Sequence, residues 1–389
     1  MTHLTEVRER AVGLRDAAGV MPANARVNFS GHTVSLVALI GVHDGQRVVG
    51  VAFDSIGRFA QSGILRDRMI PRVLAAAPDT LLDDSGRLDP AAVVACALRD
   101  EKPGGHGDRA AAAAALELAC WDLNAKLQDE PACMTIARRF GREPLGSVPV
   151  YAASGYYYPN AGLDILRDEM RSYLDLGYTT VKMKIGGAPM PEDLTRVEAV
   201  IDVVGGAGRV AVDANGRFDR PSAVEWAEAL AGYELRWYEE PGDPLDFELN
   251  RAVTDCYRGA VATGENLFSV PDVVNLVRYG GMRADRDIFQ MDAGLSYGLG
   301  EYARMLEVLE AHGFDRRFAY PHGGHLINLH IAAGLGLGGC ESYPGVFEPF
   351  GGYSDGCAPL DGRIAPTDAP GFGLERKSGL AEAIAELTA

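Results

Sequence analysis

The fold is decided by residues 181–213, VKMKIGGAPMPEDLTRVEAVIDVVGGAGRVAVD. This stretch begins and ends with a short apolar run, and a helical pattern over Glu192–Val204 separates the two runs. Strand, helix and a second parallel strand form a βαβ unit. The rhythm continues on both sides and predicts eight strands, which end near Ala153, Lys184, Asp213, Glu239, Glu265, Asp292, His322 and Glu341. Strands that alternate with helices in this way are typical of a parallel (β/α) barrel.

The first part of the chain has a different pattern. Ser35–Val42 and Arg47–Phe53 are apolar runs joined by HDGQ, which predicts a β-hairpin with a glycine turn. Helical patterns follow over Ile64–Ala75, Asp89–Arg99 and Arg109–Leu127. We therefore expect an α/β protein in which a modified (β/α) TIM-type barrel carries an α+β capping domain. The expected division is residues 1–145 for the cap, 146–345 for the barrel, and 346–389 for a segment that returns to the cap.

The composition excludes several classes of protein. Of 389 residues, 47% are hydrophobic, which is enough for a large core. The 37 Lys and Arg against 54 Asp and Glu give a net charge of −17, which argues against binding nucleic acid or an anionic membrane surface. The six dispersed cysteines indicate reduced thiols. The charged start lacks a signal peptide's apolar core, and Glu117 interrupts the apolar run Ala110–Trp121, so we expect a cytoplasmic protein without a membrane span.

Three carboxylates end consecutive strands at equal spacing. Asp213, Glu239 and Glu265 stand 26 residues apart, about one βα unit, so they come from neighbouring strands. A single acid after a strand is most often a helix cap or a loop acceptor. Three at the mouth of one barrel would repel each other without a cation, and ligation by oxygen alone favours a hard ion. The spacing therefore predicts a Mg²⁺ site.

Further polar residues follow the other strands. Lys182 and Lys184 are two residues apart on one strand, so both side chains face the mouth. A lysine beside a second lysine and a divalent cation has its ammonium form disfavoured, which suits a base. His322 follows the seventh strand, and Asp292 on the sixth can accept a hydrogen bond from its ring. Glu341, on the eighth strand, completes the polar ring.

These groups and their local sequences resemble the mandelate racemase group of the enolase superfamily, most closely the D-tartrate dehydratases within it. The strings that carry the resemblance are EKPGGHG, YYYP, VKMKIGGAP, VDANGRF, WYEE, GDPLD, ATGENLFS, LSYGL, PHGGH, IAAGLGLGG and ESYP. The resemblance covers nearly the whole chain. It implies a Mg²⁺-dependent hydro-lyase that dehydrates a small hydroxy diacid, with D-tartrate giving oxaloacetate. It also implies a symmetric homo-oligomer.

The resemblance also implies a role for each site residue. Lys184 would remove the proton α to a carboxylate, and Lys182 would stabilise the enolate. His322 would protonate the departing hydroxyl, with Asp292 as its partner. One position departs from the pattern, because Ile56 stands where an asparagine is expected and cannot donate a hydrogen bond. The metal ligands would be Asp213, Glu239 and Glu265, and the substrate would contact Asn24, Lys102, Tyr158, Lys182 and Glu341.

Other functions are compatible with the same residues. An acid-sugar dehydratase acting on a monoacid would give a 2-keto-3-deoxy acid. A hydroxy-acid racemase would use Lys184 and His322 to exchange a proton on opposite faces of the substrate. A barrel kept only as a binding or assembly module would be expected to lose a ligand or the base, whereas this chain has every member of the set.

Overall fold

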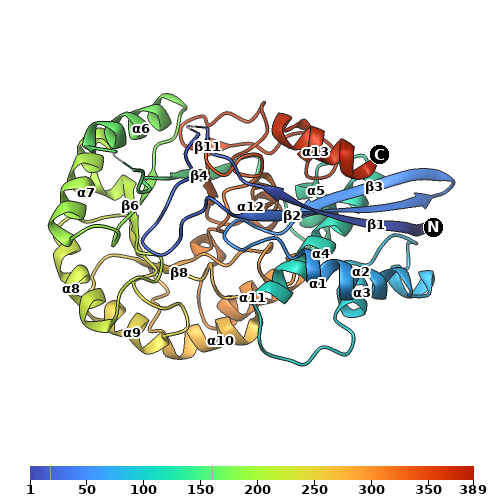
Figure 1. Cartoon of the computed structure of the whole chain (residues 1–389). Coiled ribbons are helices and arrows are strands. Elements are labelled where there is room, and N and C mark those ends of the chain that lie inside the picture. Colours follow the sequence, from blue (N-terminus) through green and yellow to red (C-terminus); the bar gives the residue numbers. More distant parts are fainter. Residues whose placement is uncertain (18, 160) are drawn as a thin grey trace.

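The structure is a computed structural model that describes residues 1–17, 19–159 and 161–389. It contains a parallel sheet surrounded by helices and, beside it, an antiparallel sheet (Figure 1). This arrangement confirms the expected barrel with a cap. The antiparallel sheet has the order β1–β2–β3, formed by Thr2–Gly13, Thr33–His43 and Gln46–Phe53.

The predicted hairpin is present as β2 and β3. Asp44 and Gly45 form its turn with positive φ angles of 49° and 83°. Strand β1 was not predicted from the sequence, although it pairs with β2 along its whole length. Only Thr2 and Val7 of β1 are buried, because an edge strand can expose polar side chains on both faces. Its sequence therefore lacks the alternation of apolar and polar residues that usually reveals a strand.

The helices of the cap pack on this sheet through α4. Every residue of α4 from Ala110 to Ala125 is buried, and most of them are small. A Cβ atom added to Gly50 of β3 would lie 2.2 Å from the Ala119 carbonyl oxygen, so helix and strand are in close contact. The cap helices are α1 (Ser62–Ile64), a π-helical turn (Leu65–Met69), α2 (Ile70–Leu74), a 3₁₀ turn (Pro78–Leu81), α3 (Pro90–Ala97), α4 (Asp108–Leu127) and α5 (Ala132–Arg139).

The parallel sheet has the order β10–β4–β5–β6–β7–β8–β9. The predicted seventh strand is reduced to a single bridge between Phe289 and Ala319. A 3₁₀ turn over Arg316–Phe318 precedes this bridge, and Pro321 after it has no N–H group to donate. The strands are β4 (Val148–Ala153), β5 (Val181–Lys184), β6 (Val210–Asp213), β7 (Trp237–Glu239), β8 (Val261–Thr263), β9 (Ile288–Phe289) and β10 (Cys340–Ser342).

Helices surround this sheet on its outer side (Figure 1). None of the helices within the described ranges is long and apolar enough to cross a membrane. The helices are α6 (Leu163–Asp175), α7 (Met190–Val204), α8 (Arg220–Leu230), α9 (Phe247–Cys256), α10 (Val270–Tyr279), α11 (Leu299–Ala311) and α12 (Leu326–Leu335), with a 3₁₀ turn at Ala207–Arg209.

A buried acid joins the cap to the barrel. Glu117 of α4 accepts hydrogen bonds from the backbone N–H groups of Leu299 and Gly300, at 2.8 and 3.0 Å. These groups begin α11, where helical N–H groups lack partners within the helix. The Trp121 indole also donates to Glu117, at 2.8 Å. Glu117, the charged residue that interrupts the apolar run of α4, thus satisfies the N-terminal N–H groups of a barrel helix.

A second buried acid holds the C-terminal segment. Asp122 accepts from the backbone N–H of Val51 in β3 at 2.8 Å and from that of Phe372 at 2.7 Å. Further along, Arg8 of β1 donates to the Leu387 carbonyl oxygen. The segment includes β11 (Arg363–Ile364), which pairs with β4, a 3₁₀ turn (Leu374–Arg376) and α13 (Ser378–Thr388). We propose the division at residues 145 and 345 on this basis.

Candidate active site

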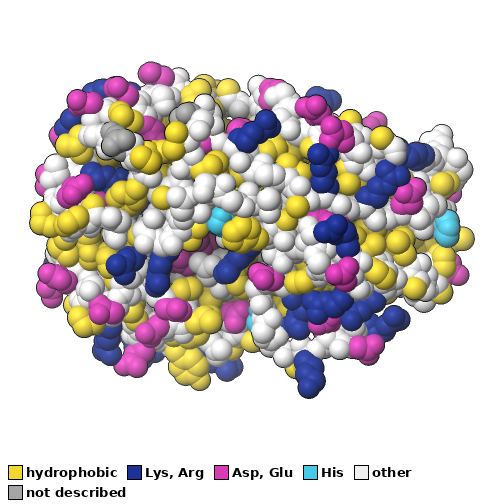
Figure 2. Space-filling view, viewed as in Figure 1, with side chains coloured by type: hydrophobic (Ala, Val, Ile, Leu, Met, Phe, Trp, Pro, Cys, Tyr) yellow, Lys and Arg dark blue, Asp and Glu magenta, His cyan; other side chains and the backbone are white. Residues whose placement is uncertain are grey.

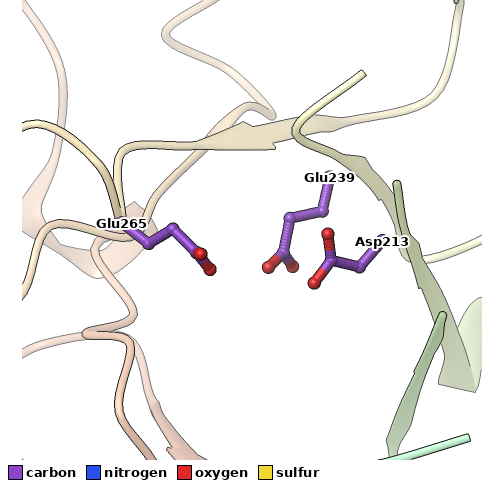
Figure 3. Close-up of side chains that lie close together, drawn as sticks. All are labelled: Asp213, Glu239 and Glu265. Atoms are coloured by element: carbon purple, nitrogen blue, oxygen red, sulfur yellow. The ribbon is translucent and has the colours of Figure 1, made fainter. Parts of the chain in front are cut away.

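Three carboxylates converge at the carboxyl ends of the parallel strands (Figure 3). Asp213 and Glu239 are paired across β6 and β7, and Glu265 follows β8. One carboxylate oxygen from each lies within 4.8 Å of those of the others. Asp213 and Glu239 are fully buried, whereas the Glu265 side chain is 15% exposed. The three predicted ligands therefore lie together, with one of them open to solvent.

The chemistry of this triad fits a hard divalent cation. Burial and the neighbouring Asp213 carboxylate raise the pKa of Glu239 to about 8. A cation would relieve that repulsion, and carboxylate oxygens are the ligands that Mg²⁺ prefers. Trp237 and Gln290 each donate to Glu239 Oε2 at 2.8 Å, which orients the carboxylate. The backbone N–H of Asn215 donates to Asp213 Oδ1, also at 2.8 Å.

The two lysines of β5 both contact these acids. Lys182 Nζ lies 2.5 Å from Glu239 Oε1 and 2.7 Å from Glu341 Oε1. Burial disfavours the ammonium, but these carboxylates outweigh it and raise the pKa of Lys182 well above its ordinary value. Lys182 is therefore held as an ammonium, which suits the enolate-stabilising role that the resemblance implies for it. Lys184 forms an ion pair with Asp213 and lines the cavity described below.

His322 is held by a buried network opposite the lysines. Its Nδ1 lies 3.2 Å from Asp292 Oδ2, and Asn328 donates to Asp292 Oδ1 at 3.0 Å. The Tyr343 hydroxyl lies 3.2 Å from His322 Nε2. A Cβ atom at Gly323, which has a φ of 106°, would lie 2.6 Å from Asp292 Oδ2. Only glycine fits there, which explains why a glycine follows the histidine.

The environment of His322 favours the imidazolium. Burial disfavours the charge, but the Glu265 carboxylate and the hydrogen bond with Asp292 raise the pKa of His322 to about 9. Its Nε2 lies 3.8 Å from Glu265 Oε2, so the ring is beside the triad. Glu341 lies deeper, paired with Lys182 and accepting from the Gly323 N–H at 2.9 Å. It supports the lysine and does not line the cavity.

A cavity of about 160 Å³ lies over these groups. Figure 2 shows a hollow near the middle of one face, with acidic side chains inside it and Lys or Arg side chains at its rim. Ile56, Phe29 and Phe347 are apolar residues of its lining, here called the apolar wall. The complete lining is Asn24, Arg26, Val27, Phe29, Ile56, Gly57, Arg58, Tyr156, Lys184, Asn215, Glu240, Glu265, Asn266, His322, Tyr343 and Phe347.

The substrate residues predicted from the resemblance lie in different places. Asn24 lines the cavity, and its side chain also accepts from two backbone N–H groups of its own turn. Lys102 is exposed and does not line the cavity. The Tyr158 hydroxyl donates to Asp16, and Tyr156 lines the cavity instead. Of the three consecutive tyrosines, the first is therefore the one at the site.

Several residues that shape the site were missed by sequence reasoning. Trp237 and Gln290 stand two residues before Glu239 and Asp292, so the period of a strand places each on the same face as its acid. Tyr343 stands two residues after Glu341, which is the same spacing in the other direction. Asn328 and the cap arginines gave no comparable signal, because their positions depend on how loops and helices pack. The missed residues are Arg26, Arg58, Tyr156, Trp237, Asn266, Gln290, Asn328 and Tyr343.

The chain is similar in sequence to known enzymes. The chain is 26% identical over 282 residues to arabinonate dehydratase of Saccharolobus solfataricus, covering 72% of this chain and 73% of that protein. It is 28% identical over 277 residues to 3,6-anhydro-alpha-L-galactonate cycloisomerase of Streptomyces coelicolor, covering 70% of each.

Solved structures have the same fold. A racemase from Streptomyces coelicolor with bound magnesium superposes with a TM-score of 0.77 at 22% identity, covering 100% of this chain and 99% of that one. An L-talarate dehydratase from Polaromonas, complexed with Mg and L-glucarate, gives a TM-score of 0.76 at 23% identity, covering 98% and 97%. Residues 166–379 match the family described as enolase C-terminal domain-like. The chain belongs to this family, within the mandelate racemase and muconate lactonizing group of the enolase superfamily.

Proposed function

We propose that the protein is a Mg²⁺-dependent hydro-lyase that dehydrates a small hydroxy diacid, with D-tartrate giving oxaloacetate. One observation carries this proposal. Lys184 and His322 line the same small cavity from either side of the three strands that hold the acidic triad. A substrate placed over the triad thus meets a base and an acid on different sides, an arrangement that allows an anti elimination.

Two proton transfers complete the reaction. Lys184 Nζ, as the free amine, takes the proton on the carbon next to one carboxylate, and the C–H electrons move into a carbon–carbon double bond. The hydroxyl on the next carbon leaves with its bonding electrons and takes a proton from His322, so one water departs. The remaining enol tautomerises to a 2-keto acid. The Lys182 ammonium lies beside Glu239 and stabilises the negative charge that develops on the substrate carboxylate.

The triad would hold the metal. Asp213, Glu239 and Glu265 are the ligands, and Mg²⁺ when bound supplies Lewis-acid stabilisation of the enolate. Asp292 keeps the proton on His322 Nδ1 by accepting from it, so Nε2 faces the cavity.

The size of the cavity supports a short substrate. At about 160 Å³ it offers little space beyond the reacting atoms. The local sequences shared with the D-tartrate dehydratases support tartrate itself. The first test is incubation of the Mg²⁺-loaded protein with D-, L- and meso-tartrate and a set of acid sugars, with detection of 2-keto acids. The proposal predicts oxaloacetate from D-tartrate.

The second candidate is an acid-sugar dehydratase acting on a monoacid. The arabinonate dehydratase relative supports it, and so does the apolar wall, because Ile56 cannot hydrogen-bond to a polar group of the substrate. Turnover of a sugar monoacid with no product from D-tartrate would select this candidate. Exchange of the α-proton without any keto acid would instead indicate a racemase.

A further inference from the structure

Two arginines from the cap meet the barrel on either side of the acidic triad. Arg26 donates from Nε, at 3.1 Å, and from Nη2 to the Gly216 carbonyl oxygen, just beyond the end of β6. Arg58 donates from Nη2 to Asn266 Oδ1 at 2.8 Å, just beyond the end of β8. Both arginines line the cavity. The cap loops that carry them supply none of the proposed metal ligands or proton-transfer groups.

Both guanidinium groups keep their charge available. Within residues 1–17, 19–159 and 161–389, neither Arg26 nor Arg58 forms an ion pair, although many arginines of this acidic chain do. A guanidinium has five N–H donors. Arg26 donates from two of its nitrogen atoms, and Arg58 from one, to uncharged oxygen atoms. The remaining donors can bind a carboxylate in a bidentate manner.

Contacts within the protein also orient Arg58. Its Cζ lies 5.0 Å from the centre of the Phe268 ring, which fixes the plane of the guanidinium. Asn266, which accepts from Arg58, donates in turn to Glu240 at 2.9 Å and to Glu265 Oε1 at 3.3 Å. One amide side chain therefore separates the arginine from a metal ligand. A carboxylate bound at Arg58 would therefore lie close enough to the triad for one short substrate to reach both.

We infer that Arg26 and Arg58 bind the second carboxylate of the substrate, the one remote from the metal, and so select diacids over monoacids. This inference rests on the proposed function and names the residues that give it its substrate class. The two arginines would fill the role that the resemblance implied for Lys102 and Tyr158, which lie outside the cavity.

The test separates binding from turnover. Succinate and butyrate differ by one carboxylate and have no hydroxyl to eliminate. The difference between their affinities, measured by calorimetric titration of the Mg²⁺-loaded protein, is therefore the contribution of the second carboxylate. The matched control is Arg217→Gln, because Arg217 lines a neighbouring surface hollow and not the cavity. We expect the wild type to bind succinate more tightly by about 10–100-fold, the range for charge-assisted hydrogen bonds. Arg26→Gln and Arg58→Gln should each lose much of this preference, and Arg217→Gln should keep it.

Turnover of D-tartrate gives the second readout. The two cavity variants should raise KM with little change in kcat, since the distal carboxylate is bound alike before and during the reaction. Equal binding of succinate and butyrate by the wild type, or a preference that survives in both variants, would overturn the inference even if D-tartrate is dehydrated. A preference that depends on both arginines, without dehydration of any diacid, would leave the inference standing and overturn the proposed function.

Discussion

The molecule buries two groups of acids that differ in what holds them. The joint acids, Glu117 and Asp122, accept hydrogen bonds from backbone N–H groups of strands, helix starts and the C-terminal segment. The mouth acids, Asp213, Glu239 and Glu265, are held largely by lysine, tryptophan and amide side chains. Backbone donors are fixed once the chain has folded, whereas side-chain ammonium groups can move when a cation or substrate arrives.

Asp122 and Asp213, one acid from each group, also differ in the direction of their pKa shift. Burial raises the pKa of Asp122, although Lys126 opposes this effect. Burial acts on Asp213 as well, but Lys184 and Lys182 outweigh it and lower the pKa of Asp213. Asp122 therefore joins parts of the fold, whereas Asp213 keeps a negative charge that a cation or a substrate can use. A buried carboxylate indicates a reactive site only when its partners are themselves side chains at a cavity.

The largest difference is expected between two lysine–aspartate pairs whose aspartates are both buried. Lys184→Ala removes the base and should lower kcat/KM by about 10³-fold, within the range for general bases. Lys126→Ala removes the partner of Asp122, 2.6 Å away, and should leave kcat unchanged in the folded enzyme. Steady-state kinetics with D-tartrate compares the two. Full activity of Lys184→Ala would show that another group is the base.

Loss of a joint acid should affect stability rather than catalysis. Asp122→Ala leaves the N–H groups of Val51 and Phe372 buried without an acceptor and removes one of the two carboxylates that pair with Lys126. We expect the free energy of unfolding to fall by roughly 2–6 kcal/mol, because each of the two buried donors left unsatisfied costs about 1–3 kcal/mol. Denaturant unfolding measures this loss, and kcat of the folded fraction should match the wild type. A loss of kcat with unchanged stability would contradict the role given to Asp122.

The other joint acid should make stability depend on pH. Burial raises the pKa of Glu117 to about 7, against the opposing hydrogen bonds from Trp121, Leu299 and Gly300. A folded-state pKa above the ordinary value of 4.5 means that its stabilisation is complete below pH 4.5 and is lost as the pH rises through 7. The difference corresponds to about 3 kcal/mol. Tm measured from pH 5 to pH 8 should fall more steeply in the wild type than in Glu117→Gln, and parallel curves would contradict this assignment.

The mouth acids should make stability depend on metal. Mg²⁺ at about 100 times its dissociation constant should stabilise the protein by about 2.7 kcal/mol, because it binds only the folded chain. Glu239→Gln removes one ligand and should abolish most of this gain, whereas Glu117→Gln should retain it. Thermal unfolding with and without EDTA provides the measurement. An equal response in both variants would show that the ion binds elsewhere.

The same contrast explains what could be predicted from the sequence. Asp213, Glu239 and Glu265 could be predicted as neighbours because parallel strands always end at one edge. Their partner Lys182 followed from the period of a strand. The places of Lys102 and Tyr158 could not be predicted, since Lys102 lies on a loop of the cap and Tyr158 on the loop after β4. Strand β1 was missed because its polar residues suit an exposed edge.

The central claim is that the mouth acids form the metal centre. Anomalous diffraction from crystals grown with Mn²⁺ in place of Mg²⁺ tests it most directly. The account predicts one strong peak about 2.1 Å from an oxygen of each of Asp213, Glu239 and Glu265, and none at Glu117 or Asp122. A saturating Mn²⁺ concentration that gives no peak at the triad, or a peak bound by other residues, would contradict the account.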